Sequence, residues 1–396
     1  MKLRKFRIGL ISSYVPKKCG IATYSRDLIE AMRQIDDIDW RLIAAEDAGD
    51  DYSYQNKEIA ILKKDNLDSY INAAEIMNEW QPDLVLLEHE YGLYGGNWVD
   101  IEYKGDKRHD PTGDYVLELV NRINAPIVTT LHTVLSDPDP ARRQVMRAIA
   151  NRSSKIVTMT DDSSQTLQHD YGISTNIIEV IPHGVPRPKK CDKNDIRQKL
   201  GLDPNKFYLL TTGLIGPNKG IAITIRALPE ILKKHPNVSL LVVGQTHPGI
   251  LATQGEAYRE SLIALADELG VGHALEFVNE YLPTEKLIDY FSSADIYLTI
   301  HSDPEQVASG TLAYALGCGL VSISTPYRYA KEVLAEGRGF LVDFNSPEGI
   351  AETVDRLINN PDLYNQTANR ATDFGELMSW DKVGGKYLNV FKEIID

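Results

Sequence analysis

Short apolar runs that alternate with amphipathic segments of helical length constrain the fold of this chain more than any other feature. The first run is residues 7–12 (RIGLIS), and a loop with proline and glycine and a helical segment from about Thr23 to Gln34 follow it. Runs that are apolar throughout are typical of strands buried on both faces, and strands separated by helices pair in parallel. The alternation therefore predicts an α/β fold in which helices cover both faces of a parallel sheet.

The alternation occurs in two series, which predicts two domains. We expect further strands at 83–87, 127–132 and 155–159 in the first series, and at 207–212, 239–243, 275–278, 296–300, 319–324 and 340–342 in the second. Residues 182–190 lie between the series, and their three prolines and three basic residues are typical of a linker. We therefore place the domains at 1–186 and 187–379. Residues 380–396 form an amphipathic helix, for which we favour a crossing back to the first domain over packing on the second.

The composition excludes one class of partner and indicates a compartment. The formal net charge is −14, whereas nucleic-acid binders need a broad cationic face, so we expect no nucleic-acid partner. Cys19, Cys191 and Cys318 show no metal spacing and no disulfide framework, which fits a reducing cytoplasm. The N-terminal region lacks the apolar core of a signal peptide, and no apolar run approaches the ~20 residues of a membrane span.

A small basic cluster surrounds the first strand. It comprises Lys2, Arg4, Lys5, Arg7, Lys17 and Lys18. One interpretation is a solvated face or a loop beside a phosphate. The other is contact with anionic lipid, which would make the protein peripheral to the inner face of the membrane.

A glycine-rich turn after the strand at 207–212 is the clearest functional motif. It reads Gly213-Leu-Ile-Gly216-Pro-Asn-Lys219-Gly220 and precedes a helix. Glycines let the backbone approach a ligand closely, and the helix offers free N–H groups to an anion. Lys219 adds a full positive charge. The spacing matches neither a Walker loop nor a dinucleotide-binding turn, so a plain strand-to-helix turn with a surface lysine stays open.

A second anion site is predicted after the strand at 296–300. The segment from His301 to Gly319 is a polar loop that leads into a helix near Ser309. Ser309, Gly310 and Thr311 offer hydroxyls and amides at the start of that helix. Two helix starts at the carboxyl ends of parallel strands are where an open α/β sheet binds its ligand.

The first half contributes polar groups at the ends of its own strands. A glycine loop around Gly20 follows the first strand, and His132 ends the strand at 127–132. Glu88, His89 and Glu90 follow the strand at 83–87, and such clusters more often line a cleft than fill a core. A buried structural histidine is the competing interpretation of His132.

Two other kinds of site are not supported. Asp137 and Asp139 have the D-x-D spacing of metal-dependent transferases, but they lie in a proline loop, so we assign no metal site. No G-x-S-x-G elbow is present, which argues against a serine hydrolase of that design.

Taken together in order, these motifs resemble the retaining GT-B glycosyltransferases of the family-4 (group 1) type over nearly the whole chain. The resemblance rests on the Gly20 loop, the strand end at Thr130-Leu-His132, the linker Ile181-Pro-His183-Gly184-Val185, Gly213 with Lys219-Gly220, Ala294-Asp295-Ile-Tyr-Leu, the helix at 309–319 and Glu332.

The resemblance implies two Rossmann-like domains whose parallel sheets face each other across a cleft. The first would hold a saccharide or glycolipid acceptor, and the second a nucleotide-sugar donor. Lys219 and the amides at 309–311 would contact the donor diphosphate, His132 would lie near the transferred sugar, and residues 279–282 would lie beside the base. No metal and no other cofactor would be needed, because cations and helix dipoles stabilise the departing diphosphate.

The candidate residues follow from these motifs and from the resemblance. The catalytic candidates are His132 and Lys219. The candidates for binding the donor are Gly20, Gly213, Lys219, Gly220, Asn279, Leu282, Glu305, Gln306, Ser309, Gly310 and Thr311.

The chain departs from the family pattern at three positions. Leu214 stands where the family usually has an arginine, so the predicted diphosphate site has one cation fewer. When the sequence is aligned through Gly319, Gln306 and Tyr314 stand where two glutamates usually hold the donor sugar and ribose, and Glu305 is one residue out of register. The ribose contact is therefore different or absent.

The sequence leaves the reaction open among three classes. We favour transfer of a hexosyl group, mannosyl or glucosyl, from a nucleotide sugar. The alternatives are a GT-B phosphorylase or phosphosugar-using transferase, and a non-catalytic relative that binds a sugar. A polar and aromatic insertion at 97–112 predicts a loop or hairpin that either sets acceptor specificity or is a solvated ornament.

Overall fold

The computed structural model describes residues 5–47, 49–54, 59–96, 98–103, 106–188 and 191–395. Lys2, Arg4 and Asn97 of the features named above lie outside the described residues. The chain divides into two compact units, Met1–Gly184 with Trp380–Asp396, and Val185–Ser379. The expected domain boundary after residue 186 lies two residues from this division.

The first unit contains an all-parallel sheet in the order β3-β2-β1-β4-β7-β8-β9. Its strands are β1 (Phe6–Ser12), β2 (Ile38–Glu46), β3 (Ala60–Lys63), β4 (Leu84–His89), β7 (Ile127–Leu131), β8 (Lys155–Thr158) and β9 (Ile178–Val180). Its helices are α1 (Gly20–Ile35), α2 (Leu67–Trp80), α3 (Val116–Val120), α4 (Pro140–Arg152), α5 (Asp161–His169) and α15 (Trp380–Ile395), with 3₁₀ turns η1 (Tyr91–Leu93) and η2 (Thr175–Ile177). α1 begins three residues before the expected Thr23.

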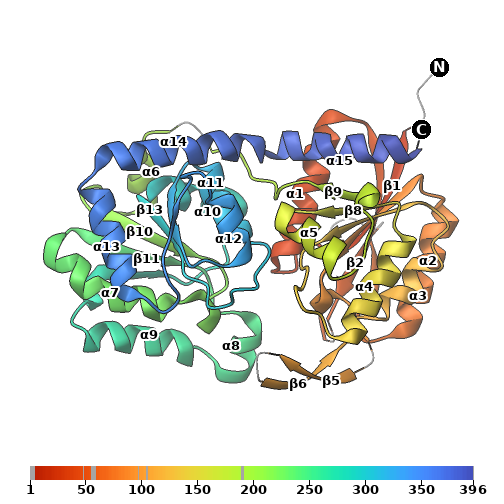
Figure 1. Cartoon of the computed structure of the whole chain (residues 1–396), viewed down its shortest axis with the longest axis horizontal. Coiled ribbons are helices and arrows are strands. Elements are labelled where there is room, and N and C mark those ends of the chain that lie inside the picture. Colours follow the sequence, from red (N-terminus) through yellow and green to blue (C-terminus); the bar gives the residue numbers. More distant parts are fainter. Residues whose placement is uncertain are drawn as a thin grey trace. The chain divides into compact units, whose positions relative to one another are not determined.

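Helices cover this sheet through alternating strand residues. Ile11, Ile43 and Val85 point to one face and pack with α2, α3 and α4 in a single apolar cluster. α15 runs beside α1 in this unit (Figure 1). The hydroxyl groups of Tyr24 in α1 and Tyr387 in α15 are 2.9 Å apart, so the last helix of the chain completes the core of the first unit.

The second unit repeats the architecture with an all-parallel sheet in the order β12-β11-β10-β13-β14-β15. Its strands are β10 (Phe207–Thr212), β11 (Val238–Val243), β12 (Leu275–Val278), β13 (Ile296–Thr299), β14 (Val321–Ser324) and β15 (Phe340–Leu341). Its helices are α6 (Lys193–Leu200), α7 (Ile221–Lys234), α8 (Pro248–Gln254), α9 (Ala257–Glu268), α10 (Thr284–Ser293), α11 (Gly310–Gly317), α12 (Arg328–Val333), α13 (Pro347–Ile358) and α14 (Pro361–Leu377), with 3₁₀ turns η3 (Pro217–Lys219) and η4 (Gly272–Ala274).

Successive residues of β10 divide between two apolar clusters. Leu209 packs with α7, α9 and α13 on one face. Tyr208 and Leu210 pack with α10, α11 and α14 on the other. Because neighbouring side chains of a strand point to opposite faces, continuous apolar runs give the sheet two buried faces. The prediction of two Rossmann-like domains built on parallel sheets is confirmed.

A proline that follows an aspartate, a serine or an asparagine starts α4, α13 and α14. Asp139, Ser346 and Asn360 each cap a helix whose first residue is proline, and each side chain accepts hydrogen bonds from amides of the first turn. Proline suits this position because its missing N–H would have no partner there. Asp139 also pairs with Arg142 at 3.0 Å, so this aspartate has a structural role.

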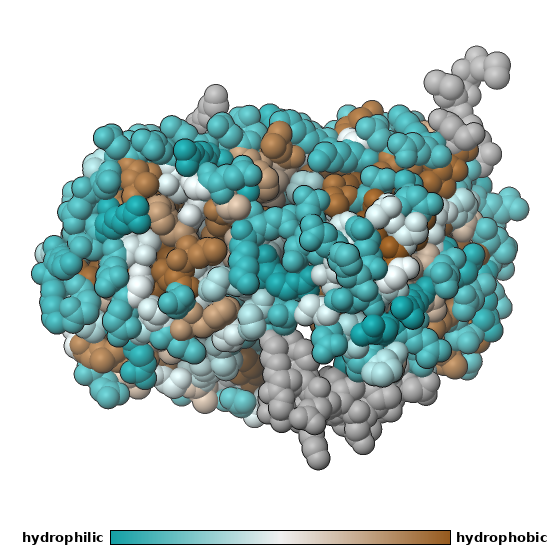
Figure 2. Space-filling model, in the orientation of Figure 1, coloured by the Kyte–Doolittle hydropathy of each residue, from teal (hydrophilic) through white to brown (hydrophobic). Residues whose placement is uncertain are grey.

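The insertion at 97–112 contains an antiparallel hairpin, β5 (Trp98–Tyr103) and β6 (Asp106–Pro111). Of the two forms that the sequence predicts, a loop or a hairpin, the structure has the hairpin. On the face that Figure 2 shows, hydrophilic residues predominate on both units, and hydrophobic residues form small separate groups. Among the helices of the described segments, none has the length and apolar character to cross a membrane.

Several side chains of the basic cluster around β1 contact carboxylate or carbonyl groups of the first unit. Lys5 Nζ lies 2.7 Å from Asp37, and Arg7 donates to the carbonyl of Trp80 at 3.1 Å. Lys17 Nζ lies 2.7 Å from Asp47 and 3.4 Å from Asp50. These contacts fit the interpretation of the cluster as a solvated face.

Candidate functional site

The order of the strands in the second sheet reverses between β10 and β13, which are neighbours in the sheet. The chain leaves β10 toward β11 on one side, whereas β13 lies on the other side of β10. The loops after these two strands therefore diverge, and open α/β sheets bind ligands in the crevice between such loops. The glycine turn at 213–220 and the loop that starts at His301 are these two loops.

Glycine is required at two positions of the turn. Gly213 has φ +119° and Gly220 has φ +61°, in the left-handed region that residues with a Cβ rarely adopt. A Cβ on Gly220 would lie 1.9 Å from the carbonyl oxygen of Ile300. A Cβ built on Gly213 would lie 3.5 Å from Lys219 Nζ and 3.8 Å from Thr311 Cγ2. The turn therefore brings the backbone of Gly213, the ammonium of Lys219 and the start of α11 together.

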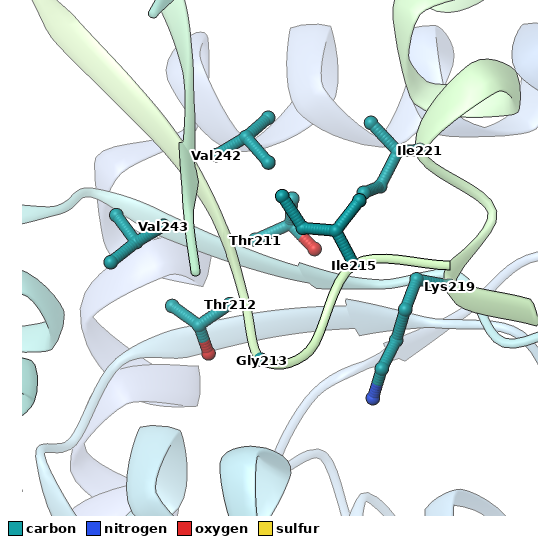
Figure 3. A pocket seen from close by; sticks show the side chains of 8 residues that line it. All are labelled: Thr211, Thr212, Gly213, Ile215, Lys219, Ile221, Val242 and Val243. Atoms are coloured by element: carbon teal, nitrogen blue, oxygen red, sulfur yellow. The ribbon is translucent and has the colours of Figure 1, made fainter. Parts of the chain in front are cut away.

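Lys219 is a cation that has no carboxylate partner among the residues that the structure describes. Its Nζ contacts His301 Nε2 at 3.4 Å, and no carboxylate of the described residues forms an ion pair with it. Burial lowers the pKa of Lys219 to about 8, because a charged ammonium is poorly solvated there. Figure 3 shows the side chain beside the Gly213 turn, directed away from Val242 and Ile221. An uncompensated, partly desolvated ammonium is a strong site for an anionic ligand.

His301 was not among the residues predicted for the site. It is 2% exposed, and its ring packs edge-on against Tyr327 at 5.1 Å. Burial, and then the field of Lys219, hold the pKa of His301 well below its usual range. The imidazole is therefore neutral and accepts from the ammonium. The only sequence signal was its position directly after a buried strand.

The start of α11 lies at the same edge of the sheet. Ser309 caps the helix and accepts from the amide of Leu312 at 3.3 Å. Its hydroxyl lies 3.5 Å from that of Thr311. The amides at Gly310 and Thr311 belong to the first turn, whose N–H groups have no partner inside a helix. The structure thus brings together Gly213, Lys219, Gly220, Ser309, Gly310 and Thr311 of the predicted residues.

The side chains of Glu305 and Gln306 both have partners within the second unit. The Gln306 side chain donates to the carbonyl of Ala308 at 2.8 Å. Glu305 lies 3.8 Å from the guanidinium of Arg328. Arg328 begins α12, and no motif in the sequence indicated that it would lie beside this loop.

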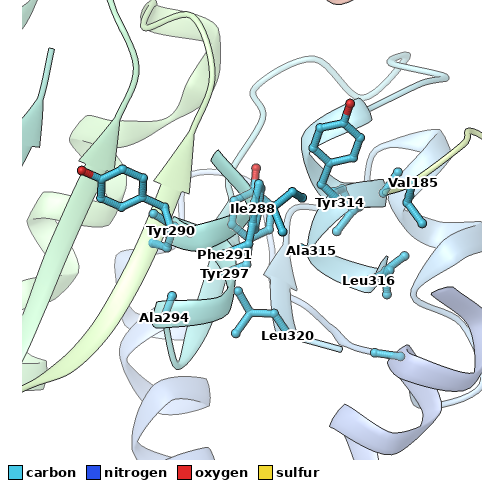
Figure 4. Packing of buried hydrophobic residues seen from close by; sticks show 14 of the residues in the cluster. Val185, Ile288, Tyr290, Phe291, Ala294, Tyr297, Tyr314, Ala315, Leu316 and Leu320 are labelled. Carbon is cyan, nitrogen blue, oxygen red and sulfur yellow. The ribbon is translucent and has the colours of Figure 1, made fainter. Parts of the chain in front are cut away.

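Tyr314, at the position of the family's second glutamate, belongs to the core. It is 7% exposed and packs edge-on against Phe291 with ring centres 6.3 Å apart. Figure 4 shows it in the same apolar cluster as Ala315 and Leu316. A side chain packed in this way does not replace a carboxylate that would hold a ribose.

The two residues expected beside the base have different surroundings. Asn279 follows β12 and donates to Glu256 at 3.4 Å. Glu256 also accepts from Thr246 at 2.5 Å and from Arg259 at 3.1 Å. Leu282 instead packs in the apolar core beside α10. Asn279 therefore belongs to a polar cluster after β11 and β12, and Leu282 is a packing residue.

The first unit places Gly20 and His132 after two of its strands. Gly20 is the first residue of α1, after Cys19 at the cap position. His132 follows β7 and is 9% exposed. Its Nε2 lies 2.7 Å from Glu88 Oε2, at the end of β4. Sequence reasoning grouped Glu88 with the polar residues after β4 but did not pair it with His132.

A chain of hydroxyl groups lies beside this pair. Tyr387 in α15 lies 2.9 Å from the hydroxyls of both Tyr24 and Thr130. The ring of Tyr24 also packs edge-on against His183 and Trp380. Nothing in the sequence indicated these contacts, because Tyr24 and Tyr387 are 363 residues apart. Within the described segments, no group of three or more His, Cys, Asp or Glu residues is arranged to hold a metal ion.

Two family patterns match separate parts of the chain. The pattern described as "Glycosyl transferases group 1" matches residues 192–374, and that described as "Glycosyltransferase Family 4" matches residues 109–187. Together they cover the glycine turn and the start of α11 in the second unit and a part of the first unit that includes His132.

Curated relatives show similarity over much of the chain. The D-inositol 3-phosphate glycosyltransferase of Rhodococcus jostii (strain RHA1) is 27% identical over 287 residues, which are 69% of this chain and 62% of that protein. The enzyme of the same name from Rhodococcus erythropolis (strain PR4 / NBRC 100887) is 27% identical over 289 residues, which are 69% of this chain and 64% of that protein. The chain thus spans less than two thirds of the length of these relatives.

Solved structures show the same fold over the whole chain. A glycosyltransferase from Rickettsia africae ESF-5 has a TM-score of 0.75 at 19% identity, with all of both chains covered. Anabaena Alr3699/HepE in complex with UDP has a TM-score of 0.74 at 15% identity, with 98% of this chain and 100% of that chain covered. At these identities the similarity shows a shared fold.

Proposed function

Because this chain belongs to the group 1 glycosyltransferases and has their GT-B fold, we propose that it transfers a hexosyl group from a nucleotide-diphosphate sugar to a saccharide or glycoconjugate acceptor. The group is mannosyl or glucosyl, and the product retains the configuration of the donor. The reaction takes place in the cytoplasm, which fits the free thiols of Cys19, Cys191 and Cys318.

The observation that carries this proposal is the unpaired ammonium of Lys219 at the carboxyl end of the second sheet. A donor diphosphate bears two negative charges, and its departure as a nucleoside diphosphate increases the charge on the leaving oxygen. Lys219, the Gly213 turn and the first-turn amides of α11 offer a cation and N–H groups to that charge. Such prearranged groups stabilise a departing anion. We therefore propose catalysis without a metal ion.

Two of the similar proteins support particular choices of substrate. Alr3699/HepE was crystallised with UDP-glucose, which favours a uridine diphosphate sugar among the donors to be tested. The Rhodococcus relatives are named for D-inositol 3-phosphate, which makes a phosphorylated polyol one acceptor to test beside simple saccharides and glycolipids. We propose retention of the anomeric configuration because the chain resembles retaining enzymes. In such enzymes the leaving phosphate assists attack on the same face of the sugar.

The proposal is tested by a donor screen on the full chain. UDP-glucose, GDP-mannose and ADP-glucose are each incubated with and without saccharide, inositol phosphate and glycolipid acceptors, in the presence and absence of EDTA. We expect transfer from at least one donor, unaffected by EDTA, with a product whose anomeric configuration equals that of the donor by NMR. Lys219→Met is expected to abolish transfer. Lys233→Met, in the last turn of α7 and 66% exposed, is the control and should leave transfer unchanged.

A second reaction is favoured by one observation. The core position of Tyr314 leaves the expected ribose contact unfilled, and the Lys219 site could hold inorganic phosphate instead of a nucleotide. Cleavage of a disaccharide that requires phosphate, with no turnover of any nucleotide sugar, would establish a phosphorylase. Either reaction, if it is lost in the Lys219→Met variant, would exclude a non-catalytic sugar-binding protein.

A further inference from the structure

His301 is a buried residue of the second unit to which the proposed chemistry gives no role. Its Nε2 lies 3.4 Å from the ammonium nitrogen of Lys219. An ammonium group can only donate a hydrogen bond, so Nε2 is the acceptor, and the neutral imidazole carries its proton on Nδ1. The contact with Lys219 therefore fixes the tautomer of His301.

Three loops hold the imidazole in place. The hydroxyl of Thr325, after β14, donates to the carbonyl of His301 at 2.6 Å. The amide of Ser302 donates to the carbonyl of Asn218, in the glycine turn, at 3.1 Å. The ring packs edge-on against Tyr327, with centres 5.1 Å apart and planes at 70°. The loops after β10, β13 and β14 thus meet at His301, and its Nε2 contacts the ammonium from a fixed position.

The arrangement is unfavourable for stability. Nδ1 of His301 is buried and has no hydrogen-bond partner among the described residues, and a buried donor without a partner costs free energy. Burial also lowers the pKa of Lys219 to about 8, which means that the poor solvation of the ammonium opposes folding. Groups that are kept at a cost to stability are found mainly at functional sites. The pair is therefore better explained by what it binds than by a contribution to stability.

The pair has no carboxylate partner in the described part of the chain. Burial lowers the pKa of Lys219, and burial together with the charge of Lys219 lowers the pKa of His301, with no contribution from a carboxylate to either. The titratable side chains on neighbouring elements are phenols with a raised pKa or carboxylates that contact other groups, namely Tyr297, Tyr327, Asp303 and Glu305. The positive charge of Lys219 is thus held by an uncharged acceptor.

We propose that His301 is a positioning residue for Lys219: its uncharged Nε2 accepts one ammonium proton and holds the ammonium beside Gly213 without neutralising it, so that the positive charge is available to an anionic ligand. A carboxylate at the same place would hold the ammonium as firmly, but it would neutralise the charge and repel the anion. The loops at 213–220 and 301–311 contain one lysine and no arginine, so these loops offer no second cation. Binding of a donor diphosphate rests on the proposed function, whereas the contact is a property of the free protein.

Three substitutions of His301 separate the effect of the acceptor from the effect of charge. His301→Phe keeps a planar ring and removes the acceptor, and it should fold because it also removes the N–H that has no partner. His301→Gln places an amide oxygen near the position of Nε2, and His301→Glu places a carboxylate there. All three are made in the full chain labelled with ¹³C and ¹⁵N in lysine, and Lys219→Met identifies the NMR signal of Lys219.

The first measurement is a pH titration of the Lys219 signal in the absence of any ligand. Loss of the acceptor destabilises the ammonium, whereas a carboxylate stabilises it. Relative to the wild type, we expect the pKa of Lys219 to be lower in His301→Phe, similar in His301→Gln and higher in His301→Glu. Equal values in His301→Phe and the wild type would show that the contact does not act on the ammonium, and would overturn the proposal.

The second measurement is the affinity for sulfate, followed by the same signal near neutral pH and at constant ionic strength. Sulfate keeps its charge in this range and needs no site for a base or a sugar. The affinity should fall about threefold to tenfold in His301→Phe, because less of Lys219 is charged. It should fall about tenfold or more in His301→Glu, because the carboxylate repels sulfate. His301→Gln should stay within about twofold of the wild type, because it keeps an uncharged acceptor.

The opposite changes expected in His301→Glu, a higher pKa of Lys219 and a lower affinity for sulfate, distinguish positioning from a purely structural role. His235 is the matched control, since it is a histidine of the same unit whose Nε2 lies 2.8 Å from Asp355. His235→Phe should change neither the Lys219 signal nor the affinity for sulfate.

Two results of the sulfate experiment would overturn the proposal. One is a wild-type protein that does not bind sulfate. The other is an equal affinity in His301→Gln and His301→Glu, a comparison that decides even if His301→Phe does not fold. If the variants behave as expected but no nucleotide sugar is turned over, only the proposed function is overturned.

Discussion

Lys219 makes the strength of the anion site depend on pH. Its pKa is lowered to about 8 by burial, and a bound diphosphate would raise this pKa because it stabilises the ammonium. The affinity for the anion is therefore highest below the pKa that Lys219 has in the free protein, and it decreases as the pH rises through this pKa. The dependence arises from one side chain, because His301 is neutral throughout this range.

We expect the affinity for a nucleotide sugar to weaken about tenfold between about pH 7 and about pH 9. A diphosphate diester is the suitable probe, because its own charge does not change in this range. Isothermal titration at several pH values measures the effect. Lys219→Met should bind weakly and without this pH dependence, and a wild-type affinity that is equal at both pH values would contradict the assignment.

Gly220 and Gly201 have similar φ angles but different surroundings. Alanine substitutions at these two positions therefore distinguish the cost of backbone strain from the cost of a steric contact. Gly220 has φ +61° and would place a Cβ 1.9 Å from Ile300 O, whereas Gly201 has φ +72° and open space around it. We expect Gly201→Ala to reduce the free energy of unfolding by about 1 kcal/mol and Gly220→Ala by about 3 kcal/mol or more. Urea denaturation measures both, and equal losses would show that the Ile300 contact is relaxed.

Single residues of the site were predictable from the sequence where a local motif marks them. Gly213, Lys219 and Ser309 are marked by glycine spacing, charge and capping chemistry next to strand ends. The contacts of Lys219 with His301 and of Glu88 with His132 were not predictable, because they join residues that are 82 and 44 positions apart. Such pairs depend on strand order, which a single sequence does not specify.

At the scale of elements, most of the strands found from the sequence are apolar throughout, although the partly exposed edge strands β12 and β15 were predicted as well. β1, β4, β7 and β10 were predicted because both of their faces are buried. β2, β3 and β9 were missed. β2 contains Asp39 and Arg41, and β3 and β9 are short and partly exposed. These three strands lie at or next to an edge of the first sheet and lack the signal that burial on both faces gives.

Asp295 fixes α6 to the second sheet through a network of hydrogen bonds. Its carboxylate accepts from Arg197 at 2.6 Å, from Lys193 at 3.0 Å and from the amide of Tyr208 at 2.7 Å. Arg197 is 4% exposed, so removal of its partner leaves a buried charge. We expect Asp295→Ala to lower the free energy of unfolding by about 3–5 kcal/mol.

Asp289→Ala is the matched control for this element. Asp289 pairs with Lys199, also in α6, but that lysine is 69% exposed. Solvent-exposed pairs of this kind contribute little to the free energy of unfolding. Chemical denaturation of both variants tests the difference, and comparable losses would show that the Asp295 network is no stronger than a surface ion pair.

At the scale of the whole molecule, the first unit is built from two separate parts of the chain. The sequence indicated an amphipathic helix at 380–396, and its placement beside α1 required the structure. Tyr387 carries the most specific contact, because its hydroxyl joins Tyr24 and Thr130 in a buried site. Periodicity alone shows that a helix has an apolar face but not which surface covers it.

We expect Tyr387→Phe to lower the free energy of unfolding by about 1–3 kcal/mol, because it leaves two buried hydroxyls with one partner fewer. Tyr290→Phe is the control, since the Tyr290 hydroxyl has no hydrogen bond to the described residues although its ring is 5% exposed. Thermal unfolding monitored by circular dichroism measures both. A neutral Tyr387→Phe would mean that the hydroxyl chain contributes nothing to stability.

The return of α15 to the first unit has a consequence for the order of events on the ribosome. Val185–Ser379 is contiguous and can fold as soon as it has emerged. Met1–Gly184 is made first, but its last helix emerges only after roughly 200 further residues, which takes roughly 10–40 s at ordinary rates of synthesis. During that interval the face of α1 that α15 later covers has no partner in the nascent chain. The half of the protein that is translated first is thus the last to be completed, and it is the half in which we expect chaperone binding during translation.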